Sequence, residues 1–375
     1  MTLSRRQKRY IRRKEKRELK KKQFLAQYDT FNRLTNFNNL CKAAAKASNH
    51  VSWKISVQKY IIDTFIKNSN LSKKLLQLKD IRQGFICFKC LERGKVRFIR
   101  AVHFSERIVQ KNLCSSILYP IYTHYIIYDN YANQKGKGTS FAIKRFEYFL
   151  RQFYKKYKRE GYILFIDFKD YFGNIDHSIL KSTYREYIKD SNLLFYIDKF
   201  VEAFGDKSLG LGSETSQLHG IMYANKLDHY IKSQLGIKYY GRYMDDSFII
   251  LHDKRELEEV RDKIIEKCKQ LKITVNTKKT KIKDLKHGFK FLKTRYLMLE
   301  TGKLLKRPTR YAITKERKKL KKLLNIKDIT NKQIWQNFNS WKGSLLTKNC
   351  RKLLYKEEME LKQHIKRRNQ EKYLV

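Results

Sequence analysis

The chain has 375 residues, with 85 Lys and Arg against 36 Asp and Glu, so its formal net charge is +49. This length allows about two domains with a large core. A charge this one-sided indicates a polyanionic partner, with nucleic acid ahead of an anionic membrane surface. The sequence has no apolar run of about 18 residues and no signal peptide, so we expect no membrane span or membrane partner and a cytoplasmic protein.

The N-terminal part is basic first and helical afterwards. Residues 1–22 carry twelve Lys or Arg against only Glu15 and Glu18. Repulsion at this density predicts disorder or a frayed helix until the block meets RNA or DNA, and a merely solvated tail is the alternative. From Phe24 to about Leu78 apolar residues recur at helical spacing. They predict core positions at Leu25, Tyr28, Phe31, Leu34, Phe37, Val57, Tyr60, Ile61 and Phe65.

Residues 80–104 change to an alternating pattern. The runs Gly84–Cys90 and Lys95–Arg100 around Glu92-Arg93-Gly94 predict a β-hairpin. Within it, Cys87-Phe88-Lys89-Cys90 is a lone Cys-x-x-Cys without the second pair of a zinc site. Residues 105–160 predict helices interrupted by a basic, Gly-containing loop at 129–140. Free N–H groups and Lys137 near the next helix start predict a phosphate contact there, although such a loop is also ordinary by itself.

Two stretches bring acids to the ends of predicted strands. Five apolar residues precede Asp167 and predict a buried strand, and Gly241–Leu251 predicts a tight hairpin with Asp245 and Asp246 at its tip. A solvated turn is the alternative for an isolated Asp pair. Adjacent strand residues point to opposite faces, so the turn must re-aim the two acids if both are to address one metal. Three such carboxylates predict a site for two Mg²⁺ ions.

The remaining acids and the C-terminal part have simpler interpretations. Asp176 is expected to cap a helix starting near His177, and Asp170 to lie at the surface. Residues 254–271 predict an amphipathic helix. From Lys303 the sequence becomes basic and helical.

The order of several motifs resembles one enzyme family. Tyr243-Met244-Asp245-Asp246 with the upstream Asp167-x-x-x-x-Phe172 resembles the palm of reverse transcriptases. Further motifs before, between and after these two resemble the family's other segments in the family's order, at residues 107–110, 135–142, 210–217, 223–228, 271–280 and 288–292. The first two of them resemble finger motifs of group II intron-type enzymes, and the match covers roughly residues 30–350.

This resemblance implies an α+β fold shaped as a right-hand polymerase, with fingers, a palm containing an antiparallel sheet, and a helical thumb. The expected divisions are a basic N-terminal extension at 1–23, N-terminal helices and fingers at 24–160, the palm at 161–302 and the thumb at 303–375. The basic face of the thumb would then grip the template–primer duplex.

The resemblance also implies roles for single residues. The implied catalytic residues are Asp167, Asp245, Asp246 and Lys279, the last as a proton donor to pyrophosphate, and the implied metal-site residues are Asp167, Phe168, Asp245 and Asp246. Phe172 would be the gate that excludes a 2′-hydroxyl. The dNTP site would comprise Lys95, Arg97, Arg100, Phe172, Leu211, Gly212 and Gln217. Nucleic acid would be contacted by Lys135, Lys137, Arg242, Tyr243 and Met244.

Departures from the family pattern indicate a subgroup. Leu211-Gly212 stands where many relatives have Gln-Gly, and Ser216-Gln217 stands where group II intron enzymes have Ser-Pro. Both resemble the error-prone reverse transcriptases of diversity-generating retroelements, while reverse transcriptases of bacteriophage defence share parts of the pattern. Lys293 replaces the usual Gly after Phe291-Leu292, at the strand expected to hold the primer end.

The predicted function is therefore an RNA-directed DNA polymerase that uses two Mg²⁺ ions in a mutagenic retroelement. The expected partners are a structured template RNA, a DNA or RNA primer, dNTPs and a small accessory protein. One alternative is an antiphage defence polymerase that copies a noncoding RNA or makes untemplated DNA. The other is a catalytically inactive RNA-binding scaffold.

Overall fold

The structure is a computed structural model that describes residues 5–92, 95–326 and 328–373. It divides into two compact units, the first formed by Met1–Gly138, Ile166–Ser247 and Val260–Thr280 and the second by Thr139–Phe165, Phe248–Glu259 and Lys281–Val375. Helices and antiparallel sheets are mixed in it, which confirms the predicted α+β class. The division into fingers, palm and thumb at the predicted residues stays a prediction. Among the described residues, no helix has the length and apolar character needed to cross a membrane.

The first unit begins with five helices, α1 (Arg5–Tyr28), α2 (Phe31–Thr35), α3 (Phe37–Ser48), α4 (Ile55–Ile62) and α5 (Thr64–Leu76). The basic block was predicted to be disordered or a frayed helix, but its described part, from Arg5, belongs to the continuous helix α1. The predicted core positions Leu25, Leu34, Val57 and Tyr60 are buried.

Three of the predicted core positions are wrong. Phe37, Ile61 and Phe65 have exposed fractions of 36%, 40% and 71%. The predicted helical spacing ran across several elements, but α4 ends at Ile62 and a new helix begins at Thr64. Because each short helix buries only one face, a spacing carried across a helix end no longer selects the buried side.

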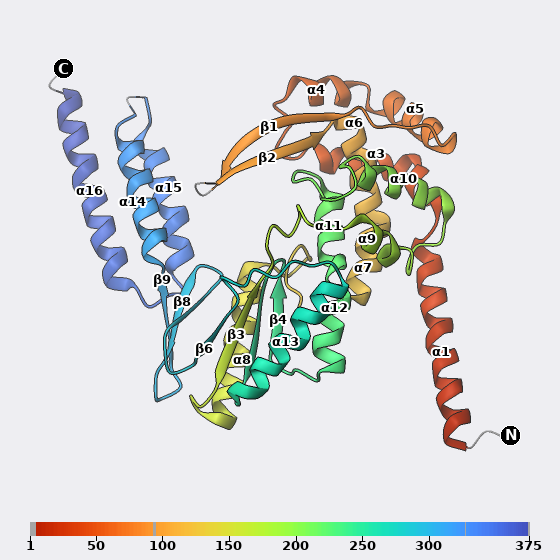
Figure 1. Ribbon diagram of the computed structural model, residues 1–375. Helices are drawn as coiled ribbons and strands as arrows, with labels where there is room; N and C mark the ends of the chain where they lie inside the picture. Colours follow the sequence, from red (N-terminus) through yellow and green to blue (C-terminus); the bar gives the residue numbers. More distant parts are fainter. Residues whose placement is uncertain (1–4, 93–94, 327, 374–375) are drawn as a thin grey trace. The chain divides into compact units, whose positions relative to one another are not determined.

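The predicted hairpin is confirmed by strands β1 (Phe85–Glu92) and β2 (Lys95–Val102), which pair antiparallel from Phe85↔Val102 to Glu92↔Lys95 (Figure 1). Arg93 and Gly94 of the predicted turn lie outside the described residues. The main chain of β2 is fastened to a distant loop, because the Arg100 N–H donates to the Leu211 carbonyl at 3.1 Å. The sequence had no signal for this contact.

The first unit also contains α6 (Phe104–Leu113), α7 (Tyr119–Tyr125), α9 (His177–Tyr184), α10 (Ser191–Glu202), α11 (Glu214–Tyr223) and α12 (Asn225–His229). A π-helical turn at Cys114–Leu118 precedes α7, and another at Tyr230–Gln234 follows α12. The predicted cap of α9 is confirmed, because the Asp176 carboxylate accepts from the Ile179 N–H at 3.1 Å. The carboxylate also pairs with Lys272 at 2.8 Å.

A four-stranded sheet has the strand order β4-β5-β3-β6, with β3 at Tyr162–Asp167, β4 at Tyr240–Tyr243, β5 at Asp246–Leu251 and β6 at Lys281–Asp284. Strand β3 pairs antiparallel with β6, from Tyr162↔Asp284 to Phe165↔Lys281. The predicted amphipathic helix is confirmed as α13 (Lys254–Gln270), whose Leu257, Ile264 and Cys268 are fully buried.

The second unit also contains α8 (Thr139–Tyr157), the sheet β7 (Phe289–Phe291), β8 (Thr294–Met298) and β9 (Leu304–Pro308), and the helices α14 (Arg310–Leu324), α15 (Asn331–Leu345) and α16 (Arg351–Tyr373). The three helices lie together (Figure 1). They share a core of Leu320, Ile334, Phe338, Leu361 and Ile365. The helical prediction from Lys303 begins too early, because Leu304–Pro308 pairs with β8 as a strand.

The β7–β8 turn has backbone strain at two residues. Leu292 and Lys293 have φ of +43° and +64°. Two successive positive φ values are typical of the hairpin turn that favours Asn-Gly, because a side chain disfavours this region. Lys293 therefore occupies a position where the Gly of the family's pattern would be unstrained.

A buried ion pair fixes the strand that leads to the acidic hairpin. Arg242 on β4 and Asp228 on α12 are both fully buried, and the guanidinium donates to both carboxylate oxygens at 2.7 and 2.6 Å. Arg242 also donates to the carbonyl oxygens of Met244 (2.9 Å) and Ile221 (3.0 Å). Asp228 accepts in addition from the Tyr240 hydroxyl at 2.6 Å. One cation thus connects β4, the turn that follows it and two helices.

Replacing one partner of this pair should be costly. In Asp228→Asn the guanidinium stays buried without a compensating charge, so we expect the free energy of unfolding to fall by about 3–5 kcal/mol. Guanidinium chloride unfolding followed by circular dichroism measures this. Glu258→Gln is the matched control, because it removes a carboxylate from the exposed Lys254–Glu258 pair and should cost about 0.5 kcal/mol or less. Equal losses in the two variants would contradict the role given to the buried pair.

Candidate active site

Asp167 ends β3 and is held from the segment that follows α13. Its main-chain carbonyl accepts from the Asn276 N–H at 2.8 Å, and its carboxylate accepts from the Asn276 side chain at 2.9 Å. The Lys279 ammonium lies 3.1 Å from both carboxylate oxygens. The predicted catalytic residues Asp167 and Lys279 are therefore in direct contact. The side chain of Asp167 is only 15% exposed, so its direction is well determined by these donors.

The turn between β4 and β5 carries the other two acids. Met244 has φ of +55°, a left-handed conformation that is disfavoured for a side chain as large as methionine. Its carbonyl is the one that Arg242 binds, so the buried guanidinium holds the turn in this conformation. Asp245 then lies in the turn and Asp246 begins β5. As expected from the alternation of a strand, the two acids are not equivalent, and only Asp245 lines the cavity described below.

The three carboxylates affect one another electrostatically. Burial raises the pKa of Asp245, and the charge of Asp167 raises it further, while Lys279 and Arg97 act in the opposite direction. Burial, together with the charges of Asp245 and Asp167, raises the pKa of Asp246 to about 6. Negative charge is therefore crowded here, and a bound cation would be favourable.

No group of three His, Cys, Asp or Glu side chains among the described residues has the arrangement of a metal site. Asp167 is turned toward Lys279 and Asn276. Phe168, which was predicted at the metal site, has its ring buried and its main chain bridged to Val275. The ring has no ligand atom, so only the main-chain carbonyl of Phe168 is available for that role.

A cavity of about 770 Å³ brings most of the predicted nucleotide-site residues together. It is lined by acids, cations and apolar residues from the predicted site: Asp167, Asp245, Lys279, Arg97, Arg100, Phe172 and Leu211. The half-buried Phe172 is the predicted gate. Gly220 of α11 lies beneath its ring, since a Cβ there would come within 2.9 Å of Phe172 Cε1. The Gly220 carbonyl accepts from the Tyr171 hydroxyl at 2.6 Å, which fixes the neighbouring aromatic residue as well.

The loop of the middle motif is shaped by the hairpin. Gly212 has φ of +119°, and a Cβ there would lie 3.0 Å from Ile99 Cγ2 and 3.2 Å from the Arg100 carbonyl oxygen. Only glycine fits this conformation and this approach without strain. The predicted glycine therefore has a packing role, as it lets the loop close against β2. Gln217 is exposed and lines the adjoining cavities beside Gly212.

The predicted phosphate-binding cations of the hairpin differ in position. Arg97 pairs in register with Cys90 and Arg100 with Cys87. The side chains of Arg97 and Arg100 therefore leave opposite faces of the ribbon, because side chains alternate along a strand. Arg97 is the one whose charge acts on Asp245. The side chain of Lys95 lies outside the described residues.

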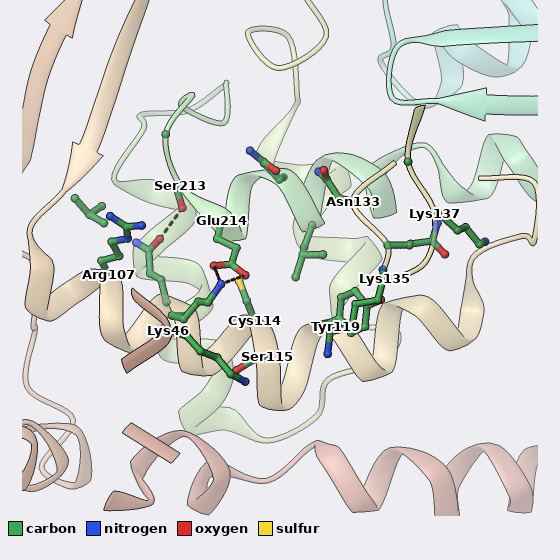
Figure 2. A pocket seen from close by; sticks show the side chains of 18 of the residues that line it. Lys46, Arg107, Cys114, Ser115, Tyr119, Asn133, Lys135, Lys137, Ser213 and Glu214 are labelled. Carbon is green, nitrogen blue, oxygen red and sulfur yellow. Dashed lines mark hydrogen bonds and ion pairs between the residues drawn. The ribbon is translucent and has the colours of Figure 1, made fainter. Parts of the chain in front are cut away.

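A second cavity, of about 950 Å³, is lined by the predicted loop cations (Figure 2). Lys137 donates to the carbonyls of Tyr128 (2.7 Å) and Asn130 (3.1 Å), so it braces the loop. Lys135 lies over the Tyr119 ring at 5.2 Å. Lys46 and Arg107 add positive charge, and Glu214 is paired with Lys111 at 2.9 Å. The cavity is thus mainly cationic, and Tyr243 lines both this cavity and the first one.

The prediction that Arg242 contacts nucleic acid is wrong. Its side chain is fully buried and every nitrogen donates to a protein oxygen. A strand pattern marks which residues share a face, but it does not reveal that a cation is neutralised by an acid fourteen positions earlier. Tyr243 and Met244 do line the cavities, so they stay predicted contacts.

The sequence interpretation missed four supporting residues. Asp228 lies in the motif at residues 223–228, and Asn276 and Thr280 lie in the motif at 271–280, but the motifs give these residues no individual role. Gly220 lies outside the motifs. Thr280 and Asn276 both contact Asp167, the former through a 3.4 Å hydrogen bond to its N–H. Their proximity depends on the return of the chain after α13, which local spacing does not encode.

Comparison with known proteins gives one family and two structural likenesses. The family model "Reverse transcriptase (RNA-dependent DNA polymerase)" matches residues 82–295. An apo telomerase from Candida tropicalis, truncated from its C-terminal domain, is 13% identical over 60% of this chain and 55% of that chain, with a TM-score of 0.47. A telomerase from Candida albicans in complex with a fragment of telomeric RNA is 11% identical over 81% of this chain and 60% of that chain, with a TM-score of 0.48.

The chain thus spans little more than half the length of the two telomerase chains. A search of curated protein sequences found no significant match. The family model covers more than half of the present sequence and contains the predicted aspartates and the cavity that Asp167 and Asp245 line. It also confirms the predicted polymerase fold. The chain belongs to the reverse transcriptase family.

Proposed function

We propose that the protein is an RNA-directed DNA polymerase, in which the 3′ oxygen of a primer attacks the α-phosphate of a dNTP and pyrophosphate leaves. The observation that carries this proposal is the cavity in which Asp167 and Asp245 lie with Lys279, Arg97 and Phe172. It combines acids, cations and an aromatic wall, which suits a nucleoside triphosphate. The inactive scaffold is the less favoured alternative, because the set of acids is complete.

The chemistry of the three aspartates fits the Mg²⁺ ions that the family implies, and Asp167 would have to turn from Lys279 and Asn276 for the three to hold them together. Asp167, Asp245 and Asp246 offer the oxygen ligands that Mg²⁺ prefers. Burial first, and the neighbouring carboxylates in addition, raise the pKa of Asp245 and of Asp246, and a bound cation would stabilise their charged forms. Two such ions would stabilise the attacking and leaving oxygens. The main-chain carbonyl of Phe168 would complete the predicted set.

The side chains around the acids have separate tasks in this proposal. Arg97 would neutralise the triphosphate from the hairpin. Lys279 would act at the leaving pyrophosphate, as predicted, and its contact with Asp167 keeps it beside the reacting groups. Phe172 would press against the sugar and exclude a 2′-hydroxyl. The cationic cavity of Figure 2 would receive template phosphates, through Lys46, Arg107 and Lys135.

We further propose a diversity-generating retroelement as the setting, with an accessory protein as a further partner. Support comes from Leu211, whose apolar side chain lines the cavity and offers no hydrogen bond to a nascent base pair. Antiphage defence is the alternative setting.

Asp245→Asn should abolish polymerisation. Loss of one carboxylate removes several kcal/mol of charge stabilisation, so we expect dNTP incorporation on an RNA template to fall by about 100-fold or more. Primer extension with Mg²⁺ measures the rate. Asp170→Asn is the control, because Asp170 is an exposed acid that lines the same cavity and has no predicted role. Equal rates in wild type and Asp245→Asn would refute the catalytic assignment.

Gly220→Ala should impair dNTP use through Phe172. The added methyl group forces the ring into the cavity, and overpacking of this kind costs about 1 kcal/mol or more, so kcat/KM for dNTPs should fall at least about fivefold. The fall should disappear in a Phe172→Val background, where the smaller side chain leaves room. An equal fall in both backgrounds would show that Gly220 does not act through the gate.

Sequencing of the cDNA separates the proposed settings. Purification with the co-expressed flanking locus and sequencing of bound RNA supply the template. The retroelement proposal expects full-length copies with substitutions concentrated at template adenines. Faithful or repetitive DNA from a short noncoding RNA would instead favour defence.

A further inference from the structure

A buried polar cluster links α6 to the loop that carries Leu211, and the proposed polymerase steps give it no task. Its members are uncharged side chains and one carboxylate: Glu106 and Gln110 on α6, Ser213 just before α11 and Thr215 in the first turn of α11. Each of the four residues is only 2% or 3% exposed. Buried polar groups are unfavourable unless they are hydrogen-bonded, so the bonds within the cluster determine its geometry.

Gln110 is the centre of this cluster. Its side-chain oxygen accepts from the Ser213 hydroxyl at 2.6 Å and from the Thr215 hydroxyl at 3.3 Å. The two hydroxyls lie 2.6 Å apart, and Figure 2 draws the bond from Ser213 as a dashed line. The side-chain nitrogen of Gln110 donates to a Glu106 carboxylate oxygen at 2.9 Å. Gln110 thus joins α6 to the start of α11 through the two ends of its amide.

Glu106 determines which way the Gln110 amide points. An ionised carboxylate only accepts hydrogen bonds, and the other donor to Glu106 is the Gln83 N–H at 3.5 Å. Burial raises the pKa of Glu106, while these two donors and the charge of Arg82 act in the opposite direction. Because the carboxylate needs a donor, the amide nitrogen of Gln110 faces Glu106 and the amide oxygen faces the two hydroxyls.

The hydroxyl of Ser213 binds another helix in place of its own. Ser213 is the N-cap residue of α11, and a serine at this position commonly accepts from an N–H of the helix that it begins. Among the described residues, Ser213 makes no such capping bond through its side chain. Its hydroxyl donates to Gln110 instead. The start of α11 is therefore fastened to α6 by a contact between residues far apart in the sequence.

This attachment lies two residues from Leu211, which lines the nucleotide cavity. On the other side, the loop is fastened to β2, because the Leu211 carbonyl accepts from the Arg100 N–H. Gly212 stands between the two attachments. Since glycine is the residue with the greatest conformational freedom, the position of the Leu211 side chain depends on both attachments.

We propose that Gln110 is a positioning residue for the nascent base pair. Oriented by Glu106, it holds the Ser213 end of the loop and so sets how closely Leu211 approaches the base pair in the cavity. This inference rests on the proposed polymerase function. Discrimination between matched and mismatched dNTPs depends on differential binding in the transition state, and a displacement of about 1 Å in such a wall is enough to change it.

An exchange of the two side chains tests the proposal in the full chain. Gln110→Glu alone places two carboxylates against each other in the buried cluster. The double variant Glu106→Gln/Gln110→Glu restores the pattern, because the amide at position 106 donates to the carboxylate at position 110. That carboxylate still accepts from both hydroxyls, and the amide oxygen still accepts from the Gln83 N–H. Gln58→Glu is the matched control, since it makes the same change at an exposed residue on α4 of the same unit.

Primer extension on an RNA template gives kcat/KM for matched and mismatched dNTPs, and their ratio measures discrimination. In Gln110→Glu the matched kcat/KM should fall at least about tenfold, and the ratio should fall at least about fivefold. The double variant should recover both values to within about threefold of wild type, and Gln58→Glu should match wild type. Loss of folded protein alone would lower both rates equally and leave the ratio unchanged.

Hydrogen exchange in residues 208–215 reports on the loop without any catalysis. Exchange should be at least about fivefold faster in Gln110→Glu and return to the wild-type rate in the double variant. An unchanged ratio in Gln110→Glu would overturn the positioning role, and so would a double variant that recovers neither exchange nor discrimination. A wild type that incorporates no dNTP would refute the proposed function and with it the role at the base pair. Restored exchange in the double variant would then still establish the attachment of the loop.

Discussion

The geometry of the acidic hairpin depends on one buried charge, the guanidinium of Arg242. Asp228 neutralises it, and its two remaining partners are the main-chain carbonyls of Met244 and Ile221. The Tyr240 hydroxyl donates to Asp228 and so stabilises the carboxylate. Burial of a guanidinium costs several kcal/mol of desolvation free energy, which only a complete set of acceptors such as this one offsets. The same contacts impose the left-handed turn at Met244, which would otherwise relax. The position of Asp245 therefore depends on the buried residues Arg242 and Asp228, which do not line the cavity.

The cavity around Asp167 is assembled from short segments joined by main-chain hydrogen bonds. The segment from Asp167 to Lys169 is bonded to Thr274 and Asn276, and the Phe172 carbonyl accepts from Leu209. Another such bond fastens the Leu211 loop to the β1–β2 hairpin. An exposed two-stranded ribbon is marginally stable alone, so this attachment gives Arg97 a defined position relative to Asp245.

Much of the local structure was predictable from the sequence, because it depends on neighbours along the chain. The hairpin, the Asp176 cap and the amphipathic α13 follow from alternation, capping chemistry and helical period. The predictions were wrong where contacts with residues distant in the sequence determine whether a side chain is buried. Arg242 has the composition of a nucleic-acid contact, yet Asp228 and the Met244 carbonyl bury it. Phe37, Ile61 and Phe65 have the spacing of a core, yet helix ends turn them outward. Gly220 carries no local signal, since its role depends on the Phe172 ring.

Ionic strength should have two opposing effects on helix α1. Twelve Lys or Arg lie in its 24 residues against two Glu, and like charges four positions apart, such as Arg13 and Arg17, each destabilise a helix by a few tenths of a kcal/mol. Added salt screens this repulsion and favours the helix. The same salt weakens attraction to a phosphate backbone. High salt thus favours the helical form of α1 in the free protein but weakens its attraction to nucleic acid. At low salt the attraction is strong, and the phosphates of a bound nucleic acid would neutralise the Lys and Arg charges that otherwise repel one another along the helix.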